Sequence, residues 1–312
     1  MNSTRTAPAL ATLASLLACA PAPRADTTAQ AAPAAPAAPR LVATVTGLSG
    51  PEAVKYDPAR DVYYVSNFGP NAGTPADNNG FISRVNADGT VRELRWAAGG
   101  ERGATLHMPR GMALGPAHLW VADADAVRAF DLETGAPAGS VSFAGQDPGF
   151  LNDVAFGPDG ALYVTDTGKN RIYRLDVHDP RNPSQTVTVA IADTSLGSPN
   201  GITLDRRSGR MVILPYGGGS ALKAWRPGGA ALEPLLTGAG AQYDGVELTN
   251  DGALVVSSQR DSSIHVYRGG TGGPVIRGLP GRPADIALDT RRNRVAIPYI
   301  SLNRVEIWEL PR

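Results

Sequence analysis

The chain has 312 residues, of which 42% are hydrophobic, so it is long enough to bury one large core or two ordinary ones. Its 29 basic and 29 acidic side chains balance, without a basic block or stripe. This pattern excludes the electrostatic footprint that nucleic acid or an anionic membrane surface requires, and it favours a small-molecule partner. The 36 glycines and 26 prolines separate short apolar runs, which is typical of many short strands rather than long helices.

The N-terminal segment has the features of an export signal. Arg5 supplies a weak basic region, and residues 7–18 form an apolar stretch that is too short to span a bilayer. The stretch ends in Leu16-Leu17-Ala18-Cys19, which resembles the lipobox of bacterial lipoproteins. The resemblance implies a signal peptide over 1–19, acylation of Cys19, and an envelope protein that faces the periplasm or the exterior and touches the membrane only through its lipid anchor.

Ordinary secretory cleavage remains an alternative, because Ala18 and Ala20 also satisfy the small-residue rule around a cleavage site. Both readings predict an exported protein. Cys19 is the only cysteine, so a mature domain has no disulfide. Residues 20–39 are rich in Ala and Pro and predict a stiff tether, which leaves 40–312 as the folded domain.

A repeated unit fills the rest of the chain. Each unit has a short apolar run that follows a polar or small residue, and these residues, here called the mouth residues, are Glu52, Arg110, Asn152, Asn200, Asp244 and Ala284. They are separated by 58, 42, 48, 44 and 40 residues, the spacing of β-propeller blades. Six units therefore predict an all-β, six-bladed propeller.

Four short antiparallel strands are expected in each blade. In the third unit they are 154–156, a second strand over 162–165 after the turn signal Asp159-Gly160, an alternating strand over 171–175, and a weaker fourth strand over 187–189. The last unit ends after its third strand, whereas an extra strand, 41–45, precedes the first unit. We expect this N-terminal strand to complete the last blade and close the ring.

The mouth residues converge on one axis if the ring closes, since each begins the innermost strand of its blade. Two carboxylates and two carboxamides then supply oxygen ligands, with no His or Cys among them. Oxygen ligands suit a hard divalent cation, so we expect one ion, with Ca²⁺ favoured and Mg²⁺, Mn²⁺ or Zn²⁺ as alternatives.

The same positions carry a family resemblance. Gly50-Pro51-Glu52, Leu151-Asn152-Asp153, Pro199-Asn200-Gly201 and Tyr243-Asp244-Gly245 are similar to the tunnel-mouth motifs of the senescence-marker-protein/gluconolactonase family of six-bladed, metal-dependent lactonases. By that resemblance Glu52, Asn200 and Asp244 are metal ligands, and Asn152 is a further ligand or a substrate contact. Asp244 is also the candidate catalytic base, and Arg110 is expected to bind a substrate hydroxyl or a product carboxylate.

Two other interpretations stay open. Asn200 and Asp244 precede glycines, and such pairs are common in turns, so each residue alone is also explained as a turn residue. The whole chain is also compatible with a non-catalytic NHL-like propeller that binds a protein or small ligand on its rim.

Aspartates at strand ends or in turns are expected to cap backbone N–H groups, and they are Asp57, Asp123, Asp166, Asp205 and Asp289. His107 is the one histidine placed near a mouth residue.

Overall fold

The computed structural model describes residues 38–70, 76–177, 179, 181, 186–217, 219 and 221–311. The predicted signal peptide, Cys19 and the tether up to residue 37 lie outside the described residues. Within those ranges, no helix has the length and hydropathy of a membrane-spanning segment.

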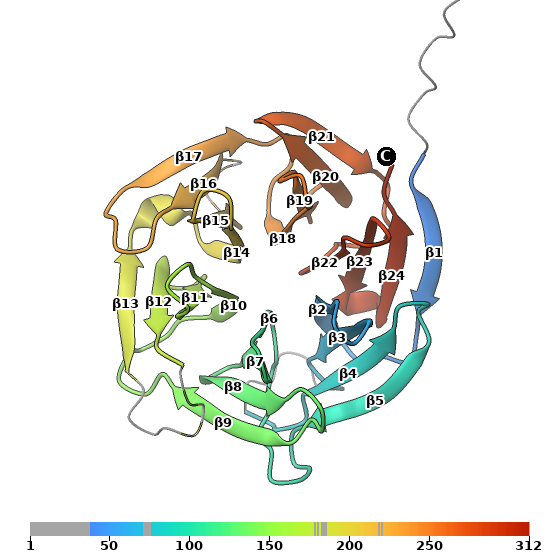
Figure 1. Cartoon of the computed structure of the whole chain (residues 1–312), viewed down its shortest axis with the longest axis vertical. Coiled ribbons are helices and arrows are strands. Elements are labelled where there is room, and N and C mark those ends of the chain that lie inside the picture. The colour runs from blue at the N-terminus through green and yellow to red at the C-terminus, as the bar shows by residue number, and fades with distance from the viewer. Residues whose placement is uncertain are drawn as a thin grey trace, which may run out of the picture. The chain divides into compact units, whose positions relative to one another are not determined.

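Six four-stranded antiparallel sheets surround a common axis, as the repeat predicted (Figure 1). Blades 1 to 5 follow chain order from the axis outward. Blade 1 consists of β2 (Pro51–Asp57), β3 (Val62–Asn67), β4 (Phe81–Asn86) and β5 (Val91–Ala98). Blade 2 consists of β6 (Met112–Leu114), β7 (His118–Ala122), β8 (Ala126–Asp131) and β9 (Pro137–Ser142). Blade 3 consists of β10 (Leu151–Phe156), β11 (Leu162–Asp166), β12 (Arg171–Leu175) and β13 (Val187–Ala192).

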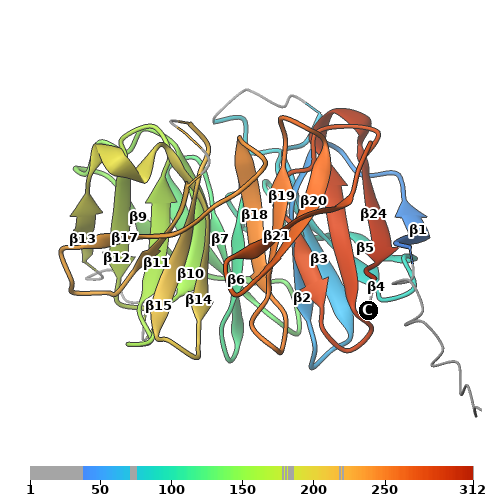
Figure 2. The same ribbon diagram turned by 90° about the horizontal axis from the view of Figure 1, so that it is seen from above.

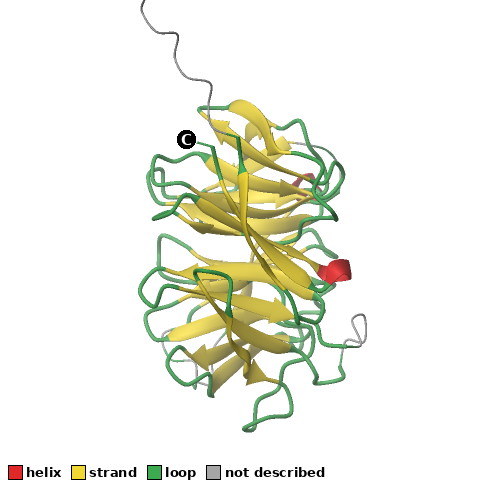
Figure 3. Cartoon of the chain, turned by 90° about the vertical axis from the view of Figure 1, so that its right-hand side faces the viewer, coloured by secondary structure: helices red, strands yellow, loops and turns green. Residues whose placement is uncertain are grey.

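Blade 4 consists of β14 (Pro199–Asp205), β15 (Arg210–Pro215), β16 (Ala221–Trp225) and β17 (Leu232–Thr237). Blade 5 consists of β18 (Tyr243–Leu248), β19 (Leu254–Ser258), β20 (Ser263–Arg268) and β21 (Thr271–Ile276). Two single-turn 3-10 helices, η1 (Thr194–Leu196) and η2 (Ile300–Leu302), lie in connections between strands. Figure 3 shows that strands and loops make up nearly all of the rest of the propeller.

Blade 6 is completed by the N-terminal strand, so this prediction is confirmed. Its sheet has the order β1-β24-β23-β22, with β1 (Arg40–Val45), β22 (Ala287–Asp289), β23 (Arg294–Tyr299) and β24 (Arg304–Glu309). Val45 of β1 pairs with Val305 of β24. The strand therefore covers the edge that the last blade would otherwise expose.

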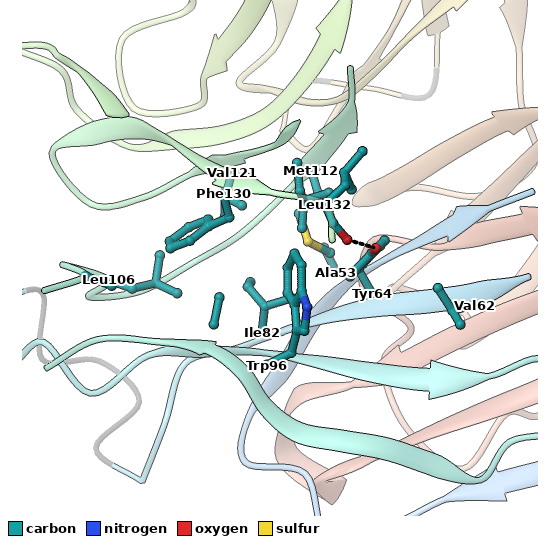
Figure 4. Packing of buried hydrophobic residues seen from close by; sticks show 13 residues of the cluster. Ala53, Val62, Tyr64, Ile82, Trp96, Leu106, Met112, Val121, Phe130 and Leu132 are labelled. Carbon is teal, nitrogen blue, oxygen red and sulfur yellow. Dashed lines mark hydrogen bonds between the residues drawn. The ribbon is translucent and has the colours of Figure 1, made fainter. Parts of the chain in front are cut away.

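The hydrophobic core lies in layers between adjacent blades. Figure 4 shows the layer between blades 1 and 2, where Tyr64 and Trp96 have ring centroids 4.8 Å apart and Phe130 comes from the neighbouring blade. The Tyr64 hydroxyl donates to the carbonyl oxygen of Leu132 in blade 2 at 3.4 Å. A similar layer joins blades 6 and 1. Packing on both faces explains why the second strand of each blade is an almost continuous apolar run.

The innermost strands run in the same direction through the ring, as Figure 2 shows from the side. Ala53 of β2 forms a parallel bridge with Asp285, just before β22, and the amide N–H of Val54 donates to the carbonyl oxygen of Asp285 at 3.0 Å. The first residues of all inner strands therefore lie at one mouth of the central tunnel.

Candidate functional site

The inner strands of four blades carry the same β-bulge at this mouth. In β2, β10, β14 and β18 the register shifts between the first and fourth residues, so that two residues lie opposite one residue of the next strand. The first residue of each bulged pair is a predicted metal ligand, and these are Glu52, Asn152, Asn200 and Asp244. Bulges re-aim side chains and occur often beside functional sites.

The interpretation of Asn200 and Asp244 as turn residues is wrong. Both lie inside strands, and the glycines that follow them are required by close packing. A Cβ atom on Gly201 would lie 2.1 Å from the carbonyl oxygen of Asp244, and one on Gly245 would lie 2.3 Å from the amide nitrogen of Ile286. The Asn-Gly and Asp-Gly pairs thus reflect inner strands that crowd together at the axis.

Buried hydroxyl groups support three of the bulges. The N–H groups of Ala53, Asp153 and Gly245 are freed from the sheet ladder by the bulge. They donate to Ser66 Oγ at 2.9 Å, Thr165 Oγ1 at 2.9 Å and Ser257 Oγ at 2.8 Å, respectively. Sequence reasoning missed this support, although a Ser or Thr at the same place in three second strands is a visible signal.

Glu52 and Asp244 are buried carboxylates at the same mouth, and the charge of Asp244 acts on Glu52. Their residues are only 5% and 4% exposed, and Glu52 Oε2 and Asp244 Oδ1 have no hydrogen-bond partner among the described residues. Burial, followed by the charge of Asp244, raises the pKa of Glu52 well above its usual value, while Arg110 opposes the rise. The two carboxyl groups are therefore close enough to interact inside the same mouth.

Asp244 is also held by its neighbours. Gln259 Nε2 donates to Asp244 Oδ2 at 2.5 Å. Burial raises the pKa of Asp244 to about 7, and the hydrogen bond from Gln259 limits this rise. Gln259 follows strand β19 directly, and sequence reasoning did not select it.

The two asparagines of the mouth use their amide nitrogens within the protein. Asn152 Nδ2 donates to Thr167 Oγ1 at 3.0 Å, and Asn200 Nδ2 donates to the carbonyl oxygen of Tyr243 at 3.3 Å. In both residues the amide oxygen is the atom that remains for a ligand.

Arg110 precedes β6 and reaches toward blade 3. Its Nη1 donates to the carbonyl oxygen of Leu151 at 2.8 Å, and its guanidinium carbon lies 3.9 Å from the ring centroid of Phe150. Arg110 Nε is buried and has no hydrogen-bond partner among the described residues. Phe150, whose side chain is exposed at 41%, is thus a second residue at this mouth that sequence reasoning missed.

A second layer of charge lies deeper in the tunnel. Lys55 Nζ donates to Glu247 Oε1 at 2.7 Å and joins blade 1 to blade 5. Burial raises the pKa of Asp153 to about 6. Burial also raises the pKa of Asp285, and the charge of Asp153 adds to this rise. Below this layer a cavity of about 480 Å³ opens at the other end of the tunnel, where Lys55 and Glu247 are among its lining residues.

The donor set at the mouth fits a hard cation. Four oxygen-bearing side chains come from four blades, and two buried carboxylate oxygens have no partner among the described residues. An unpaired buried carboxylate is costly unless a positive charge compensates it. Glu52, Asn152, Asn200 and Asp244 are therefore chemically suited to hold Ca²⁺ or a similar ion.

A second group of potential ligands, His107, Asp123 and Asp125, lies within mutual reach of one ion. Arg128 donates to both aspartates, at 2.6 and 2.5 Å. His107 Nδ1 accepts the amide N–H of Asn78 at 3.0 Å. Each of the three residues thus already accepts a hydrogen bond within the protein, and Arg128 supplies a positive charge to both aspartates, which makes this group a weaker site for a cation than the mouth.

The predicted capping role of the strand-end aspartates is confirmed. Asp123 accepts the amide N–H groups of His107 and Met108, and Asp166 accepts that of Phe150 at 2.8 Å. Asp57, Asp205 and Asp289 cap the turns that follow them.

Comparison with known proteins gives matches at the level of structure. No family model matches the sequence, and no curated protein matches it. A gluconolactonase from Xanthomonas campestris superposes with a TM-score of 0.64 at 17% identity, over 88% of this chain and 95% of that protein. A second protein, described as a gluconolactonase by family, gives 0.64 at 19% identity, over 90% and 94% of the two chains.

Virginiamycin B lyase from Staphylococcus aureus also has this architecture. It superposes with a TM-score of 0.58 at 13% identity, over 87% of this chain and 99% of the lyase. At these identities the similarity shows the fold, which different enzymes share. The chain therefore has the six-bladed propeller of the gluconolactonases, the family that its mouth motifs resemble.

Proposed function

We propose that the chain is a divalent-cation-dependent hydrolase of the gluconolactonase type, which opens sugar lactones or similar small cyclic esters at the tunnel mouth. The observation that carries this proposal is the pair Glu52 and Asp244: two buried carboxylates from different blades, each with an oxygen that has no partner among the described residues. The gluconolactonases among the structures with this fold support the substrate class.

Glu52, Asn152, Asn200 and Asp244 would hold the cation, and Ca²⁺ is favoured because every donor is oxygen. The chemistry that a divalent cation supplies in such a site is Lewis acidity toward a carbonyl oxygen. These four residues are 4–6% exposed, so solvent has little access to the carboxylates. Low access strengthens the electrostatic interactions of the site with a bound ester.

Asp244 is the proposed general base. Its carboxylate accepts one side-chain hydrogen bond within the protein, from Gln259, which leaves lone pairs on its oxygens that can accept a proton. In the proposed reaction the oxygen of a water molecule bonds to the ester carbonyl carbon, and Asp244 takes the proton of that water. The ring C–O bond then breaks, and the proton passes to the departing alkoxide, which gives a hydroxy acid.

Arg110 and Asn152 would orient the substrate. Arg110 is fixed by Leu151 and Phe150 and keeps a buried Nε–H without a partner among the described residues, which suits a hydroxyl or carboxylate oxygen. A surface depression of about 350 Å³, lined in part by Tyr216, Gln242 and Arg260, opens on the same face. This volume is within the range that small-molecule sites occupy.

The test is hydrolysis of a panel of sugar lactones by the purified protein, followed by pH-stat titration of the released acid. We expect activity that a chelator abolishes and Ca²⁺ restores, and a loss of about 100-fold or more in Asp244→Asn. Asp159→Asn is the matched control, since Asp159 lies in the turn after β10 at the far end of the tunnel. Cation binding without hydrolysis of any lactone would favour the non-catalytic propeller.

We also propose that the protein is exported and acylated at Cys19, on the lipobox resemblance alone. Expression in a bacterial host with a labelled fatty acid tests this. The label should enter the wild-type protein and not Cys19→Ser. An unlabelled wild-type protein in the soluble periplasmic fraction would support ordinary secretory cleavage instead.

A further inference from the structure

The carboxylate of Asp244 is asymmetric in its contacts. Oδ2 accepts a 2.5 Å hydrogen bond from Gln259 Nε2, whereas Oδ1 is buried without a partner among the described residues. One oxygen is thus committed to the protein, and the other remains for a ligand. The geometry of this carboxylate depends on what holds Gln259.

Gln259 is fixed by its backbone and by its side-chain oxygen. Its amide N–H donates to the carbonyl oxygen of Gln242 at 3.1 Å, just before strand β18. The Tyr216 hydroxyl donates to Gln259 Oε1 at 3.2 Å. A phenol that donates to Oε1 selects one orientation of the carboxamide and thereby directs Nε2 at Asp244.

Tyr216 belongs to the neighbouring blade. It follows β15, and its amide N–H donates to the carbonyl oxygen of Ser198 at 2.9 Å, one residue before β14 begins. The same connection leads to Asn200, another mouth residue. A chain of contacts therefore runs from the start of blade 4 through Tyr216 and Gln259 to Asp244 in blade 5.

We propose that Tyr216 and Gln259 are positioning residues, which hold Asp244 in one orientation and so present Oδ1 to the cation at the mouth. This inference rests on the proposed function, because it assumes that Asp244 binds a divalent cation. A flexible carboxylate would lose entropy on binding the ion, whereas a carboxylate held in advance has already lost it.

Calorimetric titration of the full-length protein with CaCl₂ tests the proposal without reference to catalysis. Gln259→Met keeps the length of the side chain but removes the donor, and we expect the Kd for Ca²⁺ to rise about tenfold. Tyr216→Phe removes one hydroxyl, and we expect a rise of about two- to fourfold. Gln259→Asn keeps the amide donor on a side chain that is one methylene shorter, and we expect its affinity for Ca²⁺ to stay below that of wild type.

The double variant separates a relay from two independent effects. If Tyr216 acts through Gln259, Gln259→Met/Tyr216→Phe should bind Ca²⁺ no more weakly than Gln259→Met alone. Two matched controls lie elsewhere. Tyr163→Phe removes a hydroxyl that donates to Asp159 at 3.0 Å, and Gln146→Met removes an amide that donates to Val187 at 3.2 Å. Both controls should keep the wild-type Kd.

The outcomes distinguish this inference from the proposed function. Wild-type protein that binds Ca²⁺ while Gln259→Met binds equally well overturns the positioning role and leaves the cation site intact. Additive losses in the double variant overturn the relay through Tyr216. Wild-type protein that binds none of Ca²⁺, Mg²⁺, Mn²⁺ and Zn²⁺ overturns the proposed function and this inference together.

Discussion

The charge of Asp244 raises the pKa of Glu52 although the two residues belong to blades that are not adjacent in the ring. Blade 6 lies between them, and its mouth residue is Ala284, which is fully buried and carries no polar group. The amide N–H of Asp285, the next residue, donates to the carbonyl oxygen of Glu52 at 3.0 Å. Blade 6 thus supplies backbone to the mouth, while its neighbours supply the charged side chains.

This arrangement predicts that Glu52 lowers the stability of the cation-free protein and is needed for cation binding. Glu52→Gln removes a buried charge that burial and Asp244 both disfavour, so in chelator the variant should melt about 2–4 °C above wild type. Calcium should raise the melting temperature of wild type and have little effect on the variant. Differential scanning calorimetry with and without CaCl₂ measures both effects. A variant that melts lower in chelator and still responds to Ca²⁺ would contradict the assignment of Glu52.

Gly245→Ala should destabilise the fold, because its Cβ would lie 2.3 Å from the amide nitrogen of Ile286 and 2.5 Å from Asp285 Oδ1. Overpacking of this kind costs about 1–3 kcal/mol in the free energy of unfolding. Gly273→Ala is the control in the same blade, since nothing lies within 4 Å of its added Cβ. Urea unfolding of both variants makes the comparison, and equal stabilities would argue against close packing at the axis.

Thr165→Val tests the support of the bulge that carries Asn152. Thr165 Oγ1 accepts the N–H of Asp153 at 2.9 Å and donates to the carbonyl oxygen of Asn200 at 2.8 Å, so it joins blades 3 and 4. Valine has the same shape and leaves both groups unpaired, at a cost of about 1–3 kcal/mol. Thr188→Val, at an exposed position in β13, is the control. Chemical denaturation should separate the two variants, and a neutral Thr165→Val would mean that water replaces the hydroxyl.

His265 predicts a loss of stability in mild acid. The residue is fully buried in blade 5, where its imidazole contacts Ser263 Oγ at 2.7 Å and the Tyr267 hydroxyl at 2.9 Å. Burial lowers its pKa below the usual value of a histidine, although Asp261 opposes the shift. At this residue the unfolded chain therefore takes up a proton first as the pH falls through about 6.5, so the contribution of His265 to the free energy of unfolding decreases below that pH.

Unfolding in urea at pH 7.5 and 5.5 measures this dependence. Between the two values wild type should lose more stability, or gain less, than His265→Asn, because the asparagine side chain does not titrate in this range. Both proteins keep the other histidines, so the difference between them isolates His265. A variant with the same dependence on pH as wild type would show that the imidazole does not control it.

The fold was predictable because the repeat is strong. Asp-Gly turn signals, alternating third strands and a spare strand before the first unit specify both the blade count and the closure by β1. A propeller turns a sequence period directly into rotational symmetry, so positions that are equivalent in the repeat become equivalent around the axis. The mouth residues follow from that geometry alone.

The supporting contacts were harder to predict. Gln259 and Phe150 hold mouth residues from neighbouring segments, and no periodic pattern marks them. Asn200 and Asp244 were ambiguous for a related reason: Gly after Asn or Asp signals a turn in most sequences, whereas here it reflects the space between inner strands. Such contacts depend on the distance between blades, which cannot be derived from a single sequence.

A crystal structure of the protein grown with Mn²⁺ tests the cation site at the mouth, because the anomalous scattering of Mn²⁺ locates the ion. We expect a single strong peak at the tunnel mouth, at bonding distance from Glu52 Oε2 and Asp244 Oδ1 and from the amide oxygens of Asn152 and Asn200. An empty mouth, or a peak beside His107 and Asp123 instead, would contradict this assignment.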